Sequence, residues 1–353
     1  MVSRNFLHRL GLVLGILLTC VSTVSGQDDT SFSLLDEPAV PQGEEVQNAF
    51  KTTKVVNLQS LEMIDAGVFD FKMSHRFGAV NSGAVNAFGL DVATIRLGGE
   101  YGVNQRMMMG LGRYNVKSEK GVDAYVKYKW ISQTTDNKNP LSILLFGAVD
   151  YKNTRYQFNN ARPLAVGEAI NPKDPTRFWQ LSAPQRMAYV GQVIVGRKQN
   201  DKFSWQISPT VVYYGTATTL SQALSKGWVG FDSSTILKTG EEGGSAMMVN
   251  SGVSQMQLAL GMGMRYKITT RTSLNVEYIP VLTGRGDFRN SFSVGFDVET
   301  GGHVFQIDFT NSIGLNESLF ISRNTTQWNT AGVRLGFNLH RVFTVVDPSH
   351  FQK

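Results

Sequence analysis

The segment from Ser291 to Thr310 alternates apolar residues with small or charged residues, and this pattern limits what the chain can fold into. A period of two places successive side chains on opposite faces of a β-strand, so one face is apolar and the other is polar. Residues 300–302, Thr-Gly-Gly, interrupt the pattern where a tight hairpin turn is expected. The apolar positions of the two arms are Phe292, Val294, Phe296, Val298, Phe305, Ile307 and Phe309. Because this alternation recurs along the chain, it predicts a transmembrane β-barrel.

About twelve segments show the alternation, and an even strand number is typical of single-chain bacterial barrels. The expected strands span 68–80, 94–103, 107–114, 122–130, 141–151, 187–197, 203–214, 256–266, 274–280, 291–299, 303–310 and 333–340. We therefore predict an all-β fold, an antiparallel transmembrane β-barrel of about 12 strands with short periplasmic turns and long outer loops.

The connections between these strands fall into two classes by length. The turns after every second strand are short, and they lie near 104, 132–140, 198–202, 269–272 and 300–302. The longest connections are on the opposite side, at 152–185, 216–254, 282–290 and 312–329. A soluble secreted β-sandwich is the alternative fold, but it has no reason to sort its connections in this way. The sorting favours the barrel.

The chain begins with the pattern of a secretory signal peptide, which we assign to residues 1–26. Arg4 and Arg9 form a basic region before an apolar run from Leu10 to Cys20, and small residues at 24–26 offer a cleavage site. Cys20 is the only cysteine. The residue before it is a threonine, which fits a lipoprotein cleavage site poorly, so lipidation of Cys20 is left as an alternative.

Residues 27–65 are acidic, contain Pro38 and Pro41, and lack sustained alternation, so we interpret them as a mostly flexible acidic leader on the periplasmic side. The barrel is expected at 66–345, and residues 346–353 form a C-terminal tail. The chain carries a net charge of +6, and the acidic leader makes the barrel itself more basic. In an exported barrel, basic residues meet anionic lipid headgroups or line the lumen, so nucleic acid is not expected as a partner.

Composition excludes a helical membrane protein. Apolar residues make up 42% of the chain and the mean hydropathy is −0.14. Beyond the N-terminus, no run reaches the roughly 18 apolar residues that a membrane-spanning helix needs. A barrel has this intermediate hydropathy because only alternate residues face hydrocarbon.

Two pairs of short motifs resemble an uncharacterised family of bacterial β-barrel proteins assigned to the outer membrane. One pair is KTTKVVN at 51–57 and FKMSHRFG at 71–78, and the other is GGHVFQ at 301–306 and TNS at 310–312. The resemblance covers about residues 50–340, which includes the whole expected barrel. It implies a fold and a membrane location but no established activity, and no catalytic residue is carried over from it.

The charged residues on the polar parity of the strands must face the lumen. A basic side chain on the lipid face costs about 2–4 kcal/mol at the bilayer midplane. The lumen-facing candidates are Asp70, Lys72, Arg76, Arg96, Glu100, Asp123, Lys127, Lys129, Arg265, Glu277, Asp297, Asp308 and Arg334. Together with Lys267 they give a small cationic excess, so a conducting lumen is expected to prefer anions weakly. Salt-bridged side chains that largely fill the lumen are the other outcome.

The candidate chemistry is sparse. His75, His303 and His340 have no second ligand at a metal-binding spacing, and we expect interfacial or structural roles for them. Ser74 and His75 are the one local pair that suggests a hydrolase, but adjacent residues point to opposite faces of a strand. We expect neither metal nor cofactor.

These observations predict a protein of the bacterial outer membrane without catalytic activity, either a passive narrow channel of porin-like type or a structural or surface protein. Two alternatives are kept, an outer-membrane hydrolase of lipid or peptide and the soluble secreted sandwich. Expected partners are outer-membrane lipids, the barrel-assembly machinery and small anionic solutes as cargo.

Overall fold

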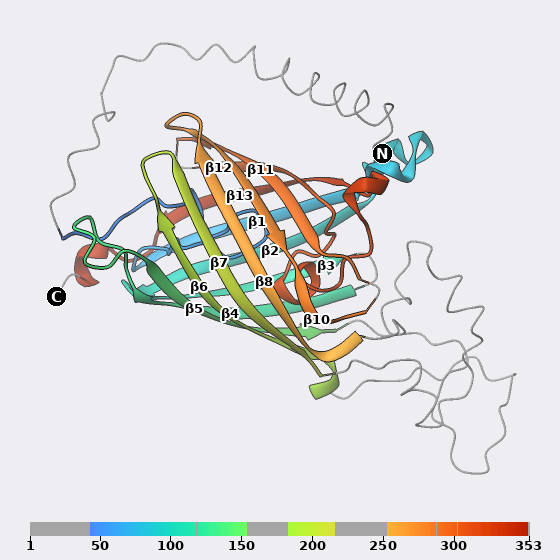
Figure 1. The fold of residues 1–353 in the computed structure, drawn as a ribbon, viewed down its shortest axis with the longest axis horizontal. Coiled ribbons are helices and arrows are strands. Elements are labelled where there is room, and N and C mark those ends of the chain that lie inside the picture. Colours follow the sequence, from blue (N-terminus) through green and yellow to red (C-terminus); the bar gives the residue numbers. More distant parts are fainter. Residues whose placement is uncertain are drawn as a thin grey trace, which may run out of the picture.

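The computed structural model describes residues 43–116, 119–153, 183–215, 253–286, 288–301 and 303–351. Its strands form one antiparallel sheet that closes into a barrel (Figure 1). The strands are β1 (Val68–Ala79), β2 (Ala93–Asn104), β3 (Met107–Val116), β4 (Glu119–Ile131), β5 (Ser142–Lys152), β6 (Met187–Lys198), β7 (Phe203–Tyr214), β8 (Val253–Lys267), β9 (Thr272–Ile279), β10 (Val281–Arg285), β11 (Ser291–Thr300), β12 (His303–Thr310) and β13 (Arg334–Thr344).

The barrel closes because the first and last strands pair, with Val68 opposite Thr344 and Arg76 opposite Gly336. Strands β9 and β10 both pair with β8 and are separated only by Pro280, which has no N–H group for the ladder. They are two parts of one wall strand. Counted in this way, the wall has twelve strands, which confirms the fold predicted from the alternation.

The helical elements among the described residues are short. They are η1 (Val80–Ser82), η2 (Ala84–Gly89), η3 (Pro184–Arg186), α4 (Glu317–Phe320), η5 (Trp328–Thr330) and η6 (Pro348–Phe351). None of the helices that the structure describes has the length and apolar character needed to cross a membrane.

The two rims of the barrel differ in their connections. The turns at 105–106, 132–141, 199–202, 268–271 and 301–302 share one rim with the start of β1 and the end of β13, and we call it the turn rim. The other connections meet at the opposite rim, the loop rim. The expected loops at 152–185 and 216–254 lie largely outside the described residues, as does the expected signal peptide.

The outer face of the wall is apolar along the strands, while the alternate residues are buried inside. The outward side chains include Leu97, Met109, Leu111, Val126, Val193, Ile207, Val211, Met264 and Phe296. This belt is the surface that a membrane-bound barrel presents to lipid, and it follows from the period of two.

The interior is filled by two segments of the chain. Residues 45–64, which we call the plug, enter at the turn rim, where Glu45 bridges to Thr134. The chain reverses between Val55 and Leu58, whose N–H and C=O groups lie 2.8 Å apart, and returns to the turn rim before β1. Residues 311–324, the inner loop, follow β12 into the barrel and contain α4. Figure 1 shows the plug in blue at the barrel.

The plug differs from the flexible periplasmic leader expected at 27–65. Its acidic residues lie near its ends, whereas the middle carries apolar side chains that the wall buries. The buried apolar members are Ala49, Phe50, Val55, Val56, Leu58 and Leu61. Burial of these groups offsets the conformational entropy that the plug loses when it is ordered. Hydrogen bonds from wall side chains to the plug backbone also offset this loss. Residues 27–42 lie outside the described part of the chain.

Three glycines of the wall leave space for the plug. A Cβ atom added at Gly261 would lie 3.0 Å from a methyl group of Leu58, and one at Gly263 would lie 3.0 Å from Val55. A Cβ atom at Gly295 would lie 2.9 Å from Val56. Plug and wall therefore fit each other closely at the centre of the barrel.

We expect Val126→Arg, near the middle of β4 on the outer face, to lower the free energy of unfolding by about 2–4 kcal/mol, because it places a cation in hydrocarbon. Denaturant unfolding in lipid vesicles, followed by heat-modifiable gel migration, measures this cost. Val345→Arg, just past β13 at the turn rim, is the matched control and should cost about 0–1 kcal/mol. Equal costs at the two positions would contradict a lipid-facing belt.

Candidate functional site: the occupied lumen

The thirteen charged residues considered for the lumen all lie on the inward parity of the wall. All are buried except Lys129, whose side chain is 15% exposed near the turn rim and pairs with Glu45 of the plug. The buried members are Asp70, Lys72, Arg76, Arg96, Glu100, Asp123, Lys127, Arg265, Glu277, Asp297, Asp308 and Arg334. Whether they line a conducting pathway is a separate question that depends on the plug.

Several of these charges pair with one another across neighbouring strands. Lys72 lies 2.6 Å from Glu100 and 3.7 Å from Asp70, which also contacts His340 at 3.2 Å. These pairs form a charged wall on β13, β1 and β2. Two further pairs extend it, Arg76 with Asp308 at 3.1 Å and Arg96 with Asp123 at 2.5 Å. Pairing of this kind is required because an isolated buried charge is strongly unfavourable.

Glu277 binds the turn of the plug. One of its carboxylate oxygens accepts hydrogen bonds from the backbone N–H groups of Val56, Asn57 and Leu58 at 3.2, 2.9 and 3.0 Å. The other oxygen accepts from the side-chain amide of Asn57 at 2.6 Å. Successive N–H groups that converge on one anion form a concave nest, which favours a negative charge. Glu277 is thus the wall's anchor for the tip of the plug.

Lys127 binds the two arms of the plug from the other side. Its ammonium group donates to the backbone carbonyls of Thr53, Ser60 and Glu62 at 3.2, 3.0 and 2.8 Å. It forms no ion pair with any residue in the described ranges. The charge of this fully buried lysine is therefore stabilised by plug carbonyls alone among its direct contacts.

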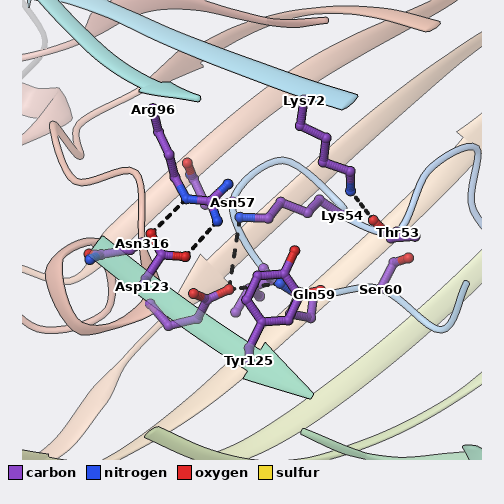
Figure 2. Close-up of polar contacts among 12 residues, drawn as sticks. Thr53, Lys54, Asn57, Gln59, Ser60, Lys72, Arg96, Asp123, Tyr125 and Asn316 are labelled. Atoms are coloured by element: carbon purple, nitrogen blue, oxygen red, sulfur yellow. Dashed lines mark hydrogen bonds and ion pairs between the residues drawn. The ribbon is translucent and has the colours of Figure 1, made fainter. Parts of the chain in front are cut away.

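Other side chains of the wall also donate to the plug. Arg76 donates to Asn57 Oδ1 at 3.0 Å, and Gln206 donates to the carbonyl of Gln59 at 2.7 Å. Gln306 donates to the carbonyl of Val55 at 2.7 Å. Arg265 donates to the carbonyls of Asn48 and Ala49 at 2.9 and 3.1 Å. Thr53 contacts both Lys72 and Glu100, and Figure 2 draws Lys72 against Thr53. The plug is held mainly by polar groups of the barrel.

The inner loop enters the lumen from the loop rim and occupies part of it. Asn316 caps α4 by accepting from the N–H group of Leu319 at 3.2 Å, and Glu317 accepts from Gln59 of the plug at 2.9 Å. Lys54 of the plug lies 3.8 Å from the same carboxylate. The inner loop is fixed to the wall through Asp150, which accepts from Ser318 at 2.6 Å and from Tyr114 at 2.7 Å. Plug and inner loop therefore meet inside the barrel.

The opposite side of the lumen carries an apolar patch, which lies among buried polar side chains such as Gln192, Gln206 and Ser208 and was not predicted from the sequence. We call it the apolar wall, and it is formed by β3 and β5–β8. Its members are Met108, Leu144, Phe146, Ala188, Val190, Ile194, Val212 and Ala259. Phe50, Leu58 and Leu61 of the plug belong to the same buried cluster. The sequence of β5 indicates an apolar inner face, because residues of both parities are apolar there. The sequence alone does not show which other strands lie on the same side of the lumen as β5.

The histidines have separate environments. His75 faces outward and stacks on Phe337 with ring centroids 5.0 Å apart, while Ser74 faces inward, so the two do not form a nucleophile and base pair. His303 is half-buried beside Phe305, and His340 contacts Asp70 inside the barrel. Within the described residues, no group of three acidic, histidine or cysteine side chains is arranged to hold a metal ion.

We expect Glu277→Gln to speed hydrogen exchange of the amides at 56–58 by roughly ten- to hundredfold, because a hydrogen bond to a charged acceptor contributes about 1.5–3 kcal/mol. Mass spectrometry of the folded protein measures the exchange. Asp297→Asn is the matched control, since the hydrogen bonds of that carboxylate come from Ser273, Asn275 and Gln306 of the wall. Unchanged exchange in Glu277→Gln would show that this carboxylate does not hold the plug.

Comparison with known proteins identifies the family. Residues 50–343 match the model of a family described as "membrane bound beta barrel domain (DUF5777)". No curated protein sequence matches the chain.

Among solved structures, the KdgM porin in complex with disordered oligogalacturonate has a TM-score of 0.42 and 8% identity, over 78% of this chain and 99% of the porin. An outer membrane channel from Pseudomonas putida F1 has a TM-score of 0.37 and 12% identity, over 80% and 98% of the two chains. Outer membrane phospholipase A from Escherichia coli has a TM-score of 0.33 and 10% identity, over 77% and 92%. The family match spans nearly the whole barrel and most of the plug, so the chain belongs to the membrane bound beta barrel domain family, DUF5777.

Proposed function

We propose that this protein is a passive, narrow channel of the bacterial outer membrane without catalytic activity, held closed by its plug in the described state. The observation that carries the proposal is the way the plug is bound. It is a hairpin with both ends at one rim, and polar side chains of the wall hold its backbone. Such a segment can leave the lumen toward the turn rim without breaking any hydrogen bond between wall strands.

The proposed orientation places the turn rim in the periplasm and the loop rim outside the cell. The apolar outer belt and the membership of a membrane-bound barrel family support a place in the membrane. Outer-membrane lipids and the barrel-assembly machinery are the partners that such a location requires. The residues before the plug would then lie on the periplasmic side.

Two other functions remain as alternatives to the channel. A structural or surface protein would keep its plug permanently, and conductance measurements separate it from a channel. A hydrolase needs a nucleophile within hydrogen-bond reach of a base, and the opposed directions of Ser74 and His75 give that reading no support.

We expect the wild-type protein in a planar bilayer to conduct rarely, and Gly263→Leu to conduct more often, because the added side chain meets Val55 and pushes the plug out. Deletion of residues 46–64 should give the largest conductance. Gly147→Leu is the matched control, since a Cβ atom at this outward glycine has no neighbour within 4 Å. Absence of added conductance in both the deletion and Gly263→Leu would support the structural alternative.

We expect the channel without its plug to prefer anions weakly, because basic residues slightly outnumber acidic ones on the inward parity. Replacing Lys127 and Lys129 with glutamate in the deletion variant should shift the preference toward cations. The reversal potential in a salt gradient measures the change, which salt screens over about 10 Å at 0.1 M. A reversal potential that ignores this double substitution would place the two lysines outside the pathway.

A further inference from the structure

We propose that Lys127, Gln192 and the apolar wall between them form a binding site for an organic carboxylate with an apolar body, such as a medium-chain fatty acid. The site is occupied by the plug in the described state. This inference rests on the proposed function, since a solute reaches the site only when the plug withdraws. It names the solute class that the channel recognises.

The site is built from residues that the sheet places in one row. Met108 is the register partner of Lys127, Lys127 is the partner of Phe146, and Phe146 is the partner of Gln192. All four side chains are buried on the inner face of β3–β6. Two strand spacings, roughly 10 Å, separate Lys127 from Gln192. Both side chains are long enough to reach a single carboxylate placed over Phe146.

Lys127 supplies the charge that selects an anion. Burial of an ammonium group is strongly unfavourable without compensation, yet the direct contacts of Lys127 inside the barrel are three neutral carbonyls of the plug. The Glu100 carboxylate attracts Lys127 but makes no ion pair with it, whereas Lys72 pairs with Glu100 directly and Arg96 pairs with Asp123. A ligand carboxylate would give Lys127 a charge-assisted hydrogen bond, which is about twice as strong as a neutral one.

Gln192 supplies an independent sign of a ligand. Its side chain is 4% exposed and points into the barrel, but neither its amide nitrogen nor its amide oxygen has a hydrogen-bond partner. A buried polar group without a partner costs about 1–3 kcal/mol, so a wall built only to hold the plug would gain from an apolar residue here. The amide nitrogen can donate to a carboxylate held by Lys127.

The plug itself shows what chemistry the site accepts. Phe50, Leu58 and Leu61 pack in one cluster with Phe146, Leu144 and Ile194, and plug carbonyl oxygens face Lys127. The occupant of the site thus combines an apolar body with acceptor oxygens. A fatty acid has the same two parts and adds a full negative charge, so it can compete with the plug.

The test is calorimetric titration of the full-length protein in lipid nanodiscs with sodium octanoate, with empty nanodiscs subtracted for partition into lipid. The Glu277→Gln background loosens the plug and should bind octanoate more tightly than the wild type. Adding Lys127→Met to it should weaken octanoate binding about tenfold, the loss expected for one hydrogen bond to a charged group. Binding of 1-octanol, which has no charge, should change less than twofold.

Lys138→Met is the matched control, because it removes one positive charge from the turn rim at an exposed residue that, within the described ranges, pairs only with Asp136 of its own turn. Heat-modifiable gel migration shows that each variant is folded. Equal octanoate affinity with and without Lys127, or no octanoate binding in the Glu277→Gln variant, would overturn the proposed site. Octanoate binding that depends on Lys127 without any conductance would support the site and contradict the channel.

Discussion

The structure depends on one constraint, that backbone polar groups facing lipid must find hydrogen-bond partners within the protein. A sheet meets this constraint only when its first and last strands pair, as β1 and β13 do here. Closure forces every second side chain inward, so the period of two seen in the sequence becomes a separation of lipid-facing and lumen-facing residues. Pro280 is tolerated because the break between β9 and β10 lets β8 pair with both.

Closure creates a second requirement, since charged side chains now point into a confined space. Pairs such as Arg76 with Asp308 satisfy each other across strands. Glu277 and Lys127 instead find their partners on the plug, as N–H groups and carbonyl groups respectively. The plug is therefore a peptide whose backbone complements the wall. When the plug is removed, Glu277 and Lys127 lose these partners and must form hydrogen bonds with water or with a ligand.

The fold could be predicted from the sequence because alternation is local and each strand carries its own signal. The paired turn at 300–302, for example, needs only residues 291–310 to be recognised. The plug could not be predicted, because its partners are distant: Glu277 lies 219–221 residues from the amides it binds. The apolar wall was missed for the same reason, since closure brings together strands whose polarity is unremarkable when each is read alone.

The two kinds of plug contact have different consequences for opening. Polar contacts such as that of Glu277 are replaced largely by water when the plug leaves, so their net cost is modest. Phe50, Leu58 and Leu61 leave apolar surface exposed on both sides, and each such side chain contributes about 1.5–3 kcal/mol when buried. The polar contacts thus set the position of the plug, and the apolar contacts supply most of the closing free energy. A small ion can replace only the first kind, whereas an apolar carboxylate can replace both, which is why the solute that opens this lumen is expected to be amphiphilic.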